Sequence, residues 1–204
     1  GEVISAKLVV YLLNERGILA KLGDTRDLIV TDSNFGDAQP LDVLSKKNVI
    51  QIFNDNKDAV LVITGFIGAN AKHETTTLGR NGSNYTASLI ANFINAEELQ
   101  NFTHVDGIYT ANPDLVADAK KIDHLTFNEA NELANFGATI LHAKTIIPLL
   151  EKNIPLRILN TFNHENKGTL ITSNANGAGI KTLSVLENVA LVNLEGRGLL
   201  GKTG

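Results

Sequence analysis

The stretch that decides the fold is residues 59–94, which read AVLVITGFIGANAKHETTTLGRNGSNYTASLIANFI. Its first residues, 59–64, are a short apolar run followed by a glycine, which is typical of a buried strand. Its last residues, 85–94, repeat apolar side chains at the spacing of a helix. Between them, residues 75–85 place hydroxyls and glycines around one arginine. The sequence therefore predicts a strand, a glycine- and hydroxyl-rich loop, and a helix.

The loop at 75–85 has the composition of an anion-binding site. A helix start presents N–H groups without partners and the positive end of the helix dipole, so a phosphate or carboxylate can bind there. The same residues also suit a plain turn that caps an ordinary helix, because Asn-Gly and Ser-Asn are turn formers. Asn81-Gly82 is a hairpin signal too, but its place between a strand and a helix argues against a hairpin. The residues alone leave the anion site and the capping turn open.

Length and composition indicate an ordinary globular protein. The 204 residues are 43% hydrophobic and 20% charged, and a net charge of −4 gives no broad basic surface for nucleic acid. No apolar run is long enough to cross a membrane, and no signal-peptide pattern opens the chain, so we expect a cytoplasmic protein without membrane or nucleic-acid partners. Cysteine is absent and the five histidines lack metal-site spacing, so no residue is assigned as a metal ligand.

Helix-like and strand-like spacing alternate along the rest of the chain. This succession predicts an α/β fold with a mostly parallel open sheet, helices on both faces and ligands at the carboxyl ends of strands. Thr126 and Glu129 form a capping box before one of the helices. The expected helices are 8–17, 43–53, 85–94, 128–135 and 142–152, and the expected strands are 18–22, 28–30, 59–64, a strand ending near 105, and 155–159.

The two ends of the chain suggest a longer protein. The first residue is not methionine, so we expect the chain to be a piece of a larger one. Residues 172–179 are small and polar, as linkers are, and 189–194 read as a strand that has no partner after it. We expect a main domain over 1–172, a linker over 173–188 and the start of a second domain over 189–204. The alternative is that the last strand closes the main sheet.

Six motifs occur in the order seen in aspartokinases, and the chain resembles that family over nearly its whole length. It looks like the kinase part of the bifunctional aspartokinase and homoserine dehydrogenase proteins. The motifs are GFIG at 65–68, TTTLGRNGSNY at 75–85, VDGIYTANP at 105–113, ELANFGATILH at 132–142, IPLRILNTF at 154–162 and GTLI at 168–171.

This resemblance implies the amino acid kinase fold and a transfer of the γ-phosphoryl group of ATP to the β-carboxylate of L-aspartate, with Mg2+. In the family this reaction opens the route to lysine, threonine and methionine. The resemblance also implies that 189–204 begin a regulatory ACT domain, that the protein is a homo-oligomer, and that a homoserine dehydrogenase domain is a candidate fusion partner.

The resemblance also assigns an aspartate pocket. Glu2 would bind the substrate ammonium, and Arg80 would pair with the α-carboxylate through two hydrogen bonds. Phe66, Thr77 and Ser83 would complete the pocket. From the residues alone, Arg80 could instead be a surface guanidinium, although its glycine and hydroxyl neighbours favour an anion site. A lone acidic residue such as Glu2 near a terminus is usually just solvated.

The nucleotide and the chemistry are assigned in the same way. Thr103, His104, Tyr109 and Thr139 occupy the family's nucleotide-binding positions. Ser83 lies at a catalytic position, as does its neighbour Asn84. Tyr109 could equally be a packed aromatic residue with its hydroxyl at the surface.

The chain departs from the family pattern at several charged positions. The glycine-rich KFGGTS segment, whose lysine contacts the transferring phosphate, does not occur, so we expect the 204 residues alone to be inactive. Lys144 either compensates for a missing lysine or is a solvated helix residue, and we favour the second interpretation. The departing positions are Asn84, His104, Asn112, Asp114 and Thr139.

Three functions therefore follow from the sequence. The first is an aspartate kinase. The second is a catalytically silent module that binds aspartate or nucleotide and signals to a regulatory region. The third is a subunit-interface domain that keeps the fold for assembly. The sequence does not separate them.

Overall fold

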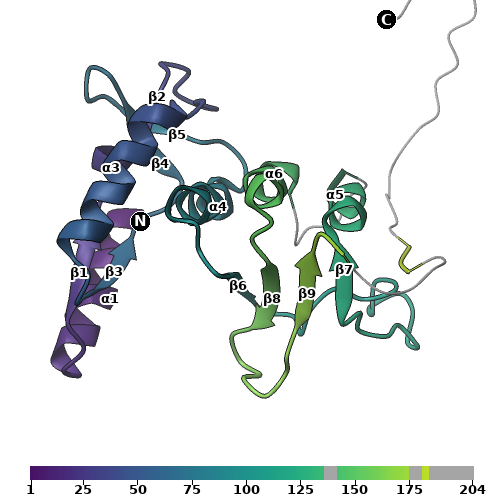
Figure 1. The fold of residues 1–204 in the computed structure, drawn as a ribbon. Coiled ribbons are helices and arrows are strands. Elements are labelled where there is room, and N and C mark those ends of the chain that lie inside the picture. Colours follow the sequence, from purple (N-terminus) through teal and green to yellow (C-terminus); the bar gives the residue numbers. More distant parts are fainter. Residues whose placement is uncertain (136–141, 175–180, 184–204) are drawn as a thin grey trace, which may run out of the picture.

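The computed structural model describes residues 1–135, 142–174 and 181–183, in which helices and strands alternate (Figure 1). The helices are α1 (Glu2–Glu15), α2 (Thr25–Leu28), α3 (Asp42–Asp55), α4 (Gly82–Ile94), α5 (Phe127–Asn135) and α6 (Ala143–Lys152). The strands are β1 (Ala20–Gly23), β2 (Val30–Thr31), β3 (Val60–Ile63), β4 (Ile67–Asn70), β5 (Thr75–Thr77), β6 (Leu99–Thr103), β7 (His124–Thr126), β8 (Leu156–Asn160) and β9 (Thr169–Thr172).

The strands form three small sheets that are mostly parallel. β1 pairs with β3, β4 lies between β2 and β5, and the third sheet has the order β6-β8-β9-β7. Of the six strand pairs described, only β4–β5 and β8–β9 are antiparallel. The predicted α/β class with a mostly parallel open arrangement is therefore confirmed, although the strands are divided among three sheets.

Helix α4 holds the two halves of the molecule together. It contacts α3 on one side and α6 on the other, and Figure 1 shows α4, α6 and α5 in a row beside the four-stranded sheet. Ala91 belongs to a hydrophobic cluster formed by β7, β8, β9, α5 and α6. Leu89 and Phe93 belong to a second cluster with α2 and α3. A fully buried Leu or Phe side chain contributes about 1.5–3 kcal/mol to folding stability. Helix α4 therefore helps to stabilise both cores.

Several predicted elements are confirmed with shifted bounds. Five of the six helices and the strands β1, β3, β6 and β8 occupy the predicted places, but α4 begins at Gly82, three residues before the predicted start. The capping box is present: the Thr126 N–H donates to Glu129 Oε2 at 2.7 Å, and the Glu129 N–H donates to Thr126 Oγ1 at 3.2 Å.

The strand-loop-helix prediction is wrong in its middle part. β4 and β5 form an antiparallel hairpin between β3 and α4, so the predicted loop begins with strand β5. The hairpin turn is held by the Asn70 side chain, whose Oδ1 accepts the N–H groups of Lys72 and Glu74 at 3.0 Å each. The three threonines of β5 are β-branched and suit a strand. The Asn81-Gly82 pair lies at the helix start, as predicted, and not in the hairpin turn.

Three short elements differ from the prediction. The expected strand at 28–30 is replaced by the end of α2 and by β2, because Asp24 accepts the Arg26 N–H and starts a helical turn there. β7 and β9 were not predicted, because each is only three or four residues long and carries little pattern.

The described part of the chain ends next to the β6–β7 connection. Of the predicted linker, the structure describes 173–174 and 181–183, and the Leu183 N–H donates to Thr110 O at 2.9 Å. The Lys181 ammonium lies 3.0 Å from the Glu129 carboxylate. The strand and ACT-like segment predicted over 189–204 lie outside the described residues. No helix within the described ranges has the length and apolar character needed to cross a membrane.

Candidate functional site

The predicted anion site lies at the N-terminus of α4. Asn81 is the N-cap residue with φ 58°, and the first turn contains no acidic residue. The Gly82 N–H donates to Gly79 O at 3.1 Å, whereas the next two N–H groups, those of Ser83 and Asn84, have no backbone acceptor among the described residues. Unpaired N–H groups at the positive end of a helix dipole attract an anion.

The segment that follows β3 packs directly on this helix start. A Cβ placed on Gly65 would lie 3.0 Å from the Cα and Cβ atoms of Ser83, and one on Gly82 would lie 2.8 Å from Phe66 Cδ2. Phe66 has φ 70°, an uncommon value for a large side chain. Its N–H donates to Thr86 Oγ1 at 3.1 Å, which fixes this conformation. The structure therefore brings the Gly65–Phe66 segment against Gly82 and Ser83 at the start of α4.

Thr77 and Arg80 flank the same place. The Thr77 hydroxyl donates to Phe35 O at 2.8 Å, so this side chain also ties β5 to the 32–41 loop. Arg80 is exposed, and its guanidinium makes no hydrogen bond or ion pair with any described residue. A guanidinium without a protein partner beside a helix start is suited to an incoming carboxylate.

Among the described residues, no hydrogen bond or ion pair joins the Glu2 side chain to this cluster. It lies in the first turn of α1, which packs mainly against β1 and β3. Within the described residues, its carboxylate forms no ion pair. Its predicted role stays a prediction.

Asn84 lies in the first turn of α4 and is half-buried. Its backbone oxygen accepts the Ser88 hydroxyl at 3.0 Å, which is a contact inside the helix. An amide at this position offers a donor and an acceptor without the charge of a carboxylate.

Two of the predicted nucleotide residues, Thr103 and His104, lie at the carboxyl end of β6. Thr103 ends β6, and its hydroxyl lies 3.4 Å from Nδ1 of the exposed His104. The Thr161 N–H donates to Thr103 O at 2.8 Å, so this carboxyl end is paired with the chain after β8. The structure therefore places Thr103 and His104 together at a strand end, where α/β proteins bind ligands.

Tyr109 lies in the connection between β6 and β7. Tyr109 is half-buried in a bridge with Lys121, and its backbone oxygen accepts the Thr182 hydroxyl at 2.9 Å. The preceding turn is held by Thr169, whose hydroxyl accepts the Ile108 N–H at 2.8 Å. Thr139 lies outside the described residues.

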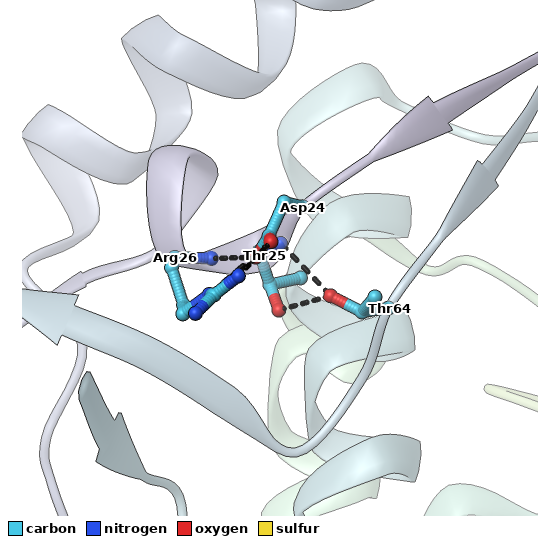
Figure 2. Close-up of polar contacts among 4 residues, drawn as sticks. All are labelled: Asp24, Thr25, Arg26 and Thr64. Carbon is cyan, nitrogen blue, oxygen red and sulfur yellow. Dashed lines mark hydrogen bonds and ion pairs between the residues drawn. The ribbon is translucent and has the colours of Figure 1, made fainter. Parts of the chain in front are cut away.

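A buried hydroxyl pair, Thr25 and Thr64, lies just before the Gly65–Phe66 segment (Figure 2). Thr64 immediately precedes Gly65, and its Oγ1 accepts the Thr25 N–H at 2.9 Å and lies 2.6 Å from Thr25 Oγ1. Both threonines are buried. Asp24, beside them, takes a hydrogen bond from the Arg26 guanidinium at 3.0 Å, and this bond holds the pKa of the Asp24 carboxyl below its usual value.

These supporting residues were not predicted, although a signal for one of them was present. An aspartate directly after a strand is a common N-cap, and Asp24 caps α2 by accepting the Arg26 N–H. The contact between Thr25 and Thr64 joins positions 39 residues apart and left no local pattern.

Lys144 differs from its predicted place as a solvated helix residue. Its ammonium lies 2.5 Å from Asp37 Oδ1, an ion pair between residues 107 positions apart. His142 accepts the Lys144 N–H on Nδ1 at 3.3 Å and is the N-cap of α6. The distance in sequence explains why the ion pair could not be predicted.

Comparison with known proteins shows the family of this chain. The pattern of the amino acid kinase family matches residues 1–160. The chain is 36% identical to bifunctional aspartokinase/homoserine dehydrogenase 2 of Zea mays, with all of this chain and 23% of the relative covered. It is 35% identical to lysine-sensitive aspartokinase 3 of Escherichia coli, with all of this chain and 46% of the relative covered. The chain thus spans less than half the length of these relatives.

A solved structure of E. coli aspartokinase III in complex with aspartate and ADP is similar as well. It superposes with a TM-score of 0.82 at 37% identity, covering 86% of this chain and 40% of the other. Sequence and fold therefore agree, and the resemblance seen in the motifs is confirmed. The chain belongs to the amino acid kinase family.

Proposed function

We propose that the protein is an aspartokinase and that this chain carries the sites for L-aspartate and ATP. The observation that supports this most is the convergence of Arg80, Phe66 and the unpaired Ser83 N–H at the start of α4. The similar E. coli enzyme was solved with aspartate and ADP, which are the two ligands that such a pair of sites would hold.

Each residue has a physical role in the proposed aspartate pocket. Arg80 would bind the α-carboxylate through two parallel hydrogen bonds, which orient it as well as attract it. Glu2 would meet the ammonium group. Phe66 would form an apolar wall, since it is already pressed against the helix start. The N–H groups of Ser83 and Asn84 would receive anionic oxygen at the positive end of the dipole.

The proposed reaction joins a β-carboxylate oxygen of aspartate to the γ-phosphorus of ATP. The bond from this phosphorus to the oxygen between the β- and γ-phosphates breaks, and β-aspartyl phosphate and ADP are formed. Such transfers depend mainly on positioning and on electrostatic stabilisation. The half-buried Asn84 amide could hydrogen-bond the transferring group without adding a negative charge.

Magnesium fits this proposal through the nucleotide. Within the described residues, no group of three or more histidine, aspartate or glutamate side chains could hold a metal ion alone. Mg2+ in phosphoryl-transfer sites keeps several waters and is held by one or two carboxylates plus substrate phosphates. When bound, it would neutralise charge that develops on the phosphates.

A silent binding module is the second candidate. It is supported by Asn84, a neutral amide where the family usually has aspartate, and by His104 in place of another aspartate. These replacements leave the carboxylate-binding residues in place. A subunit-interface domain without ligands is the third candidate.

Calorimetric titration of aspartate tests whether the pocket exists. We expect Arg80→Ala to weaken aspartate binding by at least about tenfold, because each lost hydrogen bond between charged groups is worth about 1.5–3 kcal/mol. Arg16→Ala is the matched control, since Arg16 is an exposed arginine at the end of α1. Equal binding by both variants would show that Arg80 is not part of the site. If the unsubstituted protein binds no aspartate, the subunit-interface domain is the candidate that remains.

Turnover separates the kinase from the silent module. The protein, expressed at the full length of its gene, is expected to form β-aspartyl phosphate from aspartate and ATP in the presence of Mg2+. Trapping the product with hydroxylamine gives a direct assay. Binding of both ligands without turnover would favour the silent module.

The wider setting stays a prediction. The name of the Zea mays relative supports fusion to a homoserine dehydrogenase. A homo-oligomer, a cytoplasmic location and a place at the start of lysine and threonine synthesis are likewise proposed for the whole protein.

A further inference from the structure

An ion pair lies against the loop that carries Arg80. The Lys144 ammonium and Asp37 Oδ1 are 2.5 Å apart, with 31% and 56% of their side chains exposed. A Cβ placed on Gly79 would lie 2.5 Å from the same Asp37 oxygen. Since a carbon–carbon bond is about 1.5 Å long and neighbouring Cα atoms are about 3.8 Å apart, this oxygen lies within roughly 8 Å of the Arg80 Cα.

The backbone around Asp37 is fixed from several sides. Its N–H donates to Asn34 O at 3.2 Å, and its own oxygen accepts the Gln39 Nε2 at 3.1 Å. The next residue, Ala38, donates its N–H to Thr77 O at 2.9 Å. The loop therefore keeps the carboxylate beside the predicted aspartate pocket.

The cation of the pair comes from a different part of the molecule. Lys144 lies in the first turn of α6, where His142 Nδ1 accepts its N–H. Helix α6 packs against α4, and the Asn92 side chain of α4 donates to Pro148 O at 2.7 Å. Lys144 therefore belongs to α6, and α6 is anchored to α4, the helix whose first turn forms part of the predicted pocket.

The charges explain why such a pair matters here. Asp37 Oδ1 lies within roughly 8 Å of the Arg80 Cα, about one Debye length at physiological salt, so this carboxylate would attract Arg80 and repel a dicarboxylate bound beside it. A bound ammonium cancels that field. The pair itself is partly exposed and contributes little to folding stability.

We propose that Lys144 is a positioning and specificity residue of the aspartate site, which it serves by neutralising Asp37 beside the Arg80 loop. The inference rests on the proposed function. Lys144 would strengthen the binding of the acidic substrate by neutralising Asp37, without touching the ligand itself.

Four variants test the inference by aspartate titration in low salt. Lys144→Met is expected to raise the aspartate Kd about two- to fivefold, because it frees the Asp37 charge. Asp37→Asn should leave the Kd equal or lower. The double variant should return to the value of the unsubstituted protein. Lys152→Met is the matched control, since Lys152 lies on the same helix and its ammonium meets the neutral Asn95 Oδ1 at 2.6 Å.

Two further readouts distinguish a charge effect from a loss of structure. The Lys144→Met defect should shrink at high salt, since salt screens the Asp37 charge, and the Kd for ATP with Mg2+ should not change. Equal weakening by Asp37→Asn and Lys144→Met, a defect confined to ATP, or no defect at all would overturn the inference. If the unsubstituted protein binds no aspartate, the proposed function fails together with it; if it binds but the variants match it, only this inference fails.

Discussion

At the scale of single residues, Thr64 connects the fold to the candidate pocket. Its hydroxyl is the acceptor for the buried Thr25 N–H (Figure 2). Thr64 also directly precedes the Gly65–Phe66 segment, which packs against Gly82 and Ser83. A buried N–H that loses its acceptor retains the full cost of its removal from water. The geometry of the pocket therefore depends on a hydroxyl that does not itself belong to the pocket.

Thr64→Val preserves the shape of this side chain and removes the acceptor. We expect the free energy of unfolding to fall by about 1–3 kcal/mol, because the Thr25 N–H is left without a partner. Urea denaturation measures the change. Thr161→Val, at an exposed threonine, should stay within about 0.5 kcal/mol. Equal stability of the two variants would show that the Thr25 N–H finds another acceptor.

At the scale of elements, the antiparallel pair β8–β9 requires a residue without a side chain. Gly168 precedes β9 with φ 68°, and a Cβ there would lie 1.9 Å from Ile158 O in β8. The backbone of β8 would have to move to make room. β9 lies between β8 and β7, so this contact affects the centre of the third sheet.

Gly17 offers a control for Gly168, because it has φ 77° but no atom within 4 Å of its Cβ position. Gly17→Ala is expected to lower the free energy of unfolding by about 1–2 kcal/mol, which is the penalty of a left-handed conformation alone. Gly168→Ala should cost at least about 2 kcal/mol more, because the clash with β8 is added. Thermal or urea unfolding of both variants measures the difference, and similar losses would contradict the described register of β8 and β9.

Elements with a strong periodic pattern were the ones that the sequence predicted. The long helices α3 and α4 and the apolar strand β3 repeat side chains at a clear spacing. The β4–β5 hairpin was missed because its turn is made by the Asn70 side chain and lacks glycine or proline. Strands as short as β7 and β9 depend on their partners in the sheet for stability, which a local pattern does not record.

The candidate site was predictable where its residues are close in sequence. Arg80 and Ser83 fall in one glycine-rich loop, and the family motifs added Phe66. The contacts that hold this loop join Thr25 to Thr64 and Asp37 to Lys144, at separations of 39 and 107 residues. Packing of distant segments decides such contacts, so a single sequence gave no signal for them.

At the scale of the whole molecule, Asn92 links the two cores through α4. Its amide donates to Pro148 O at 2.7 Å and to Glu151 Oε2 at 3.3 Å, and the residue is 8% exposed. Its neighbours Ala91 and Phe93 lie in different hydrophobic clusters. Weakening the contact between α4 and α6 should therefore lower the stability of both hydrophobic clusters.

Asn92→Ala tests this coupling. We expect a loss of about 1–3 kcal/mol in unfolding free energy, since Pro148 O loses a buried donor. Hydrogen exchange followed by mass spectrometry should show faster exchange in peptides from both β1–β3 and β6–β9. Asn128→Ala, at an exposed asparagine of α5, is the control. Faster exchange in only one half would mean that the halves unfold separately.

The position of α4 has a consequence for how the protein tolerates change. Helix α4 begins with the N–H groups of the candidate anion site, and its later residues pack in both hydrophobic cores. We expect substitutions that alter the volume of either core to displace α4 and so to change the position of its first turn. Variants selected for altered ligand affinity should therefore appear among buried aliphatic residues far from the pocket as well as among the polar residues that line it.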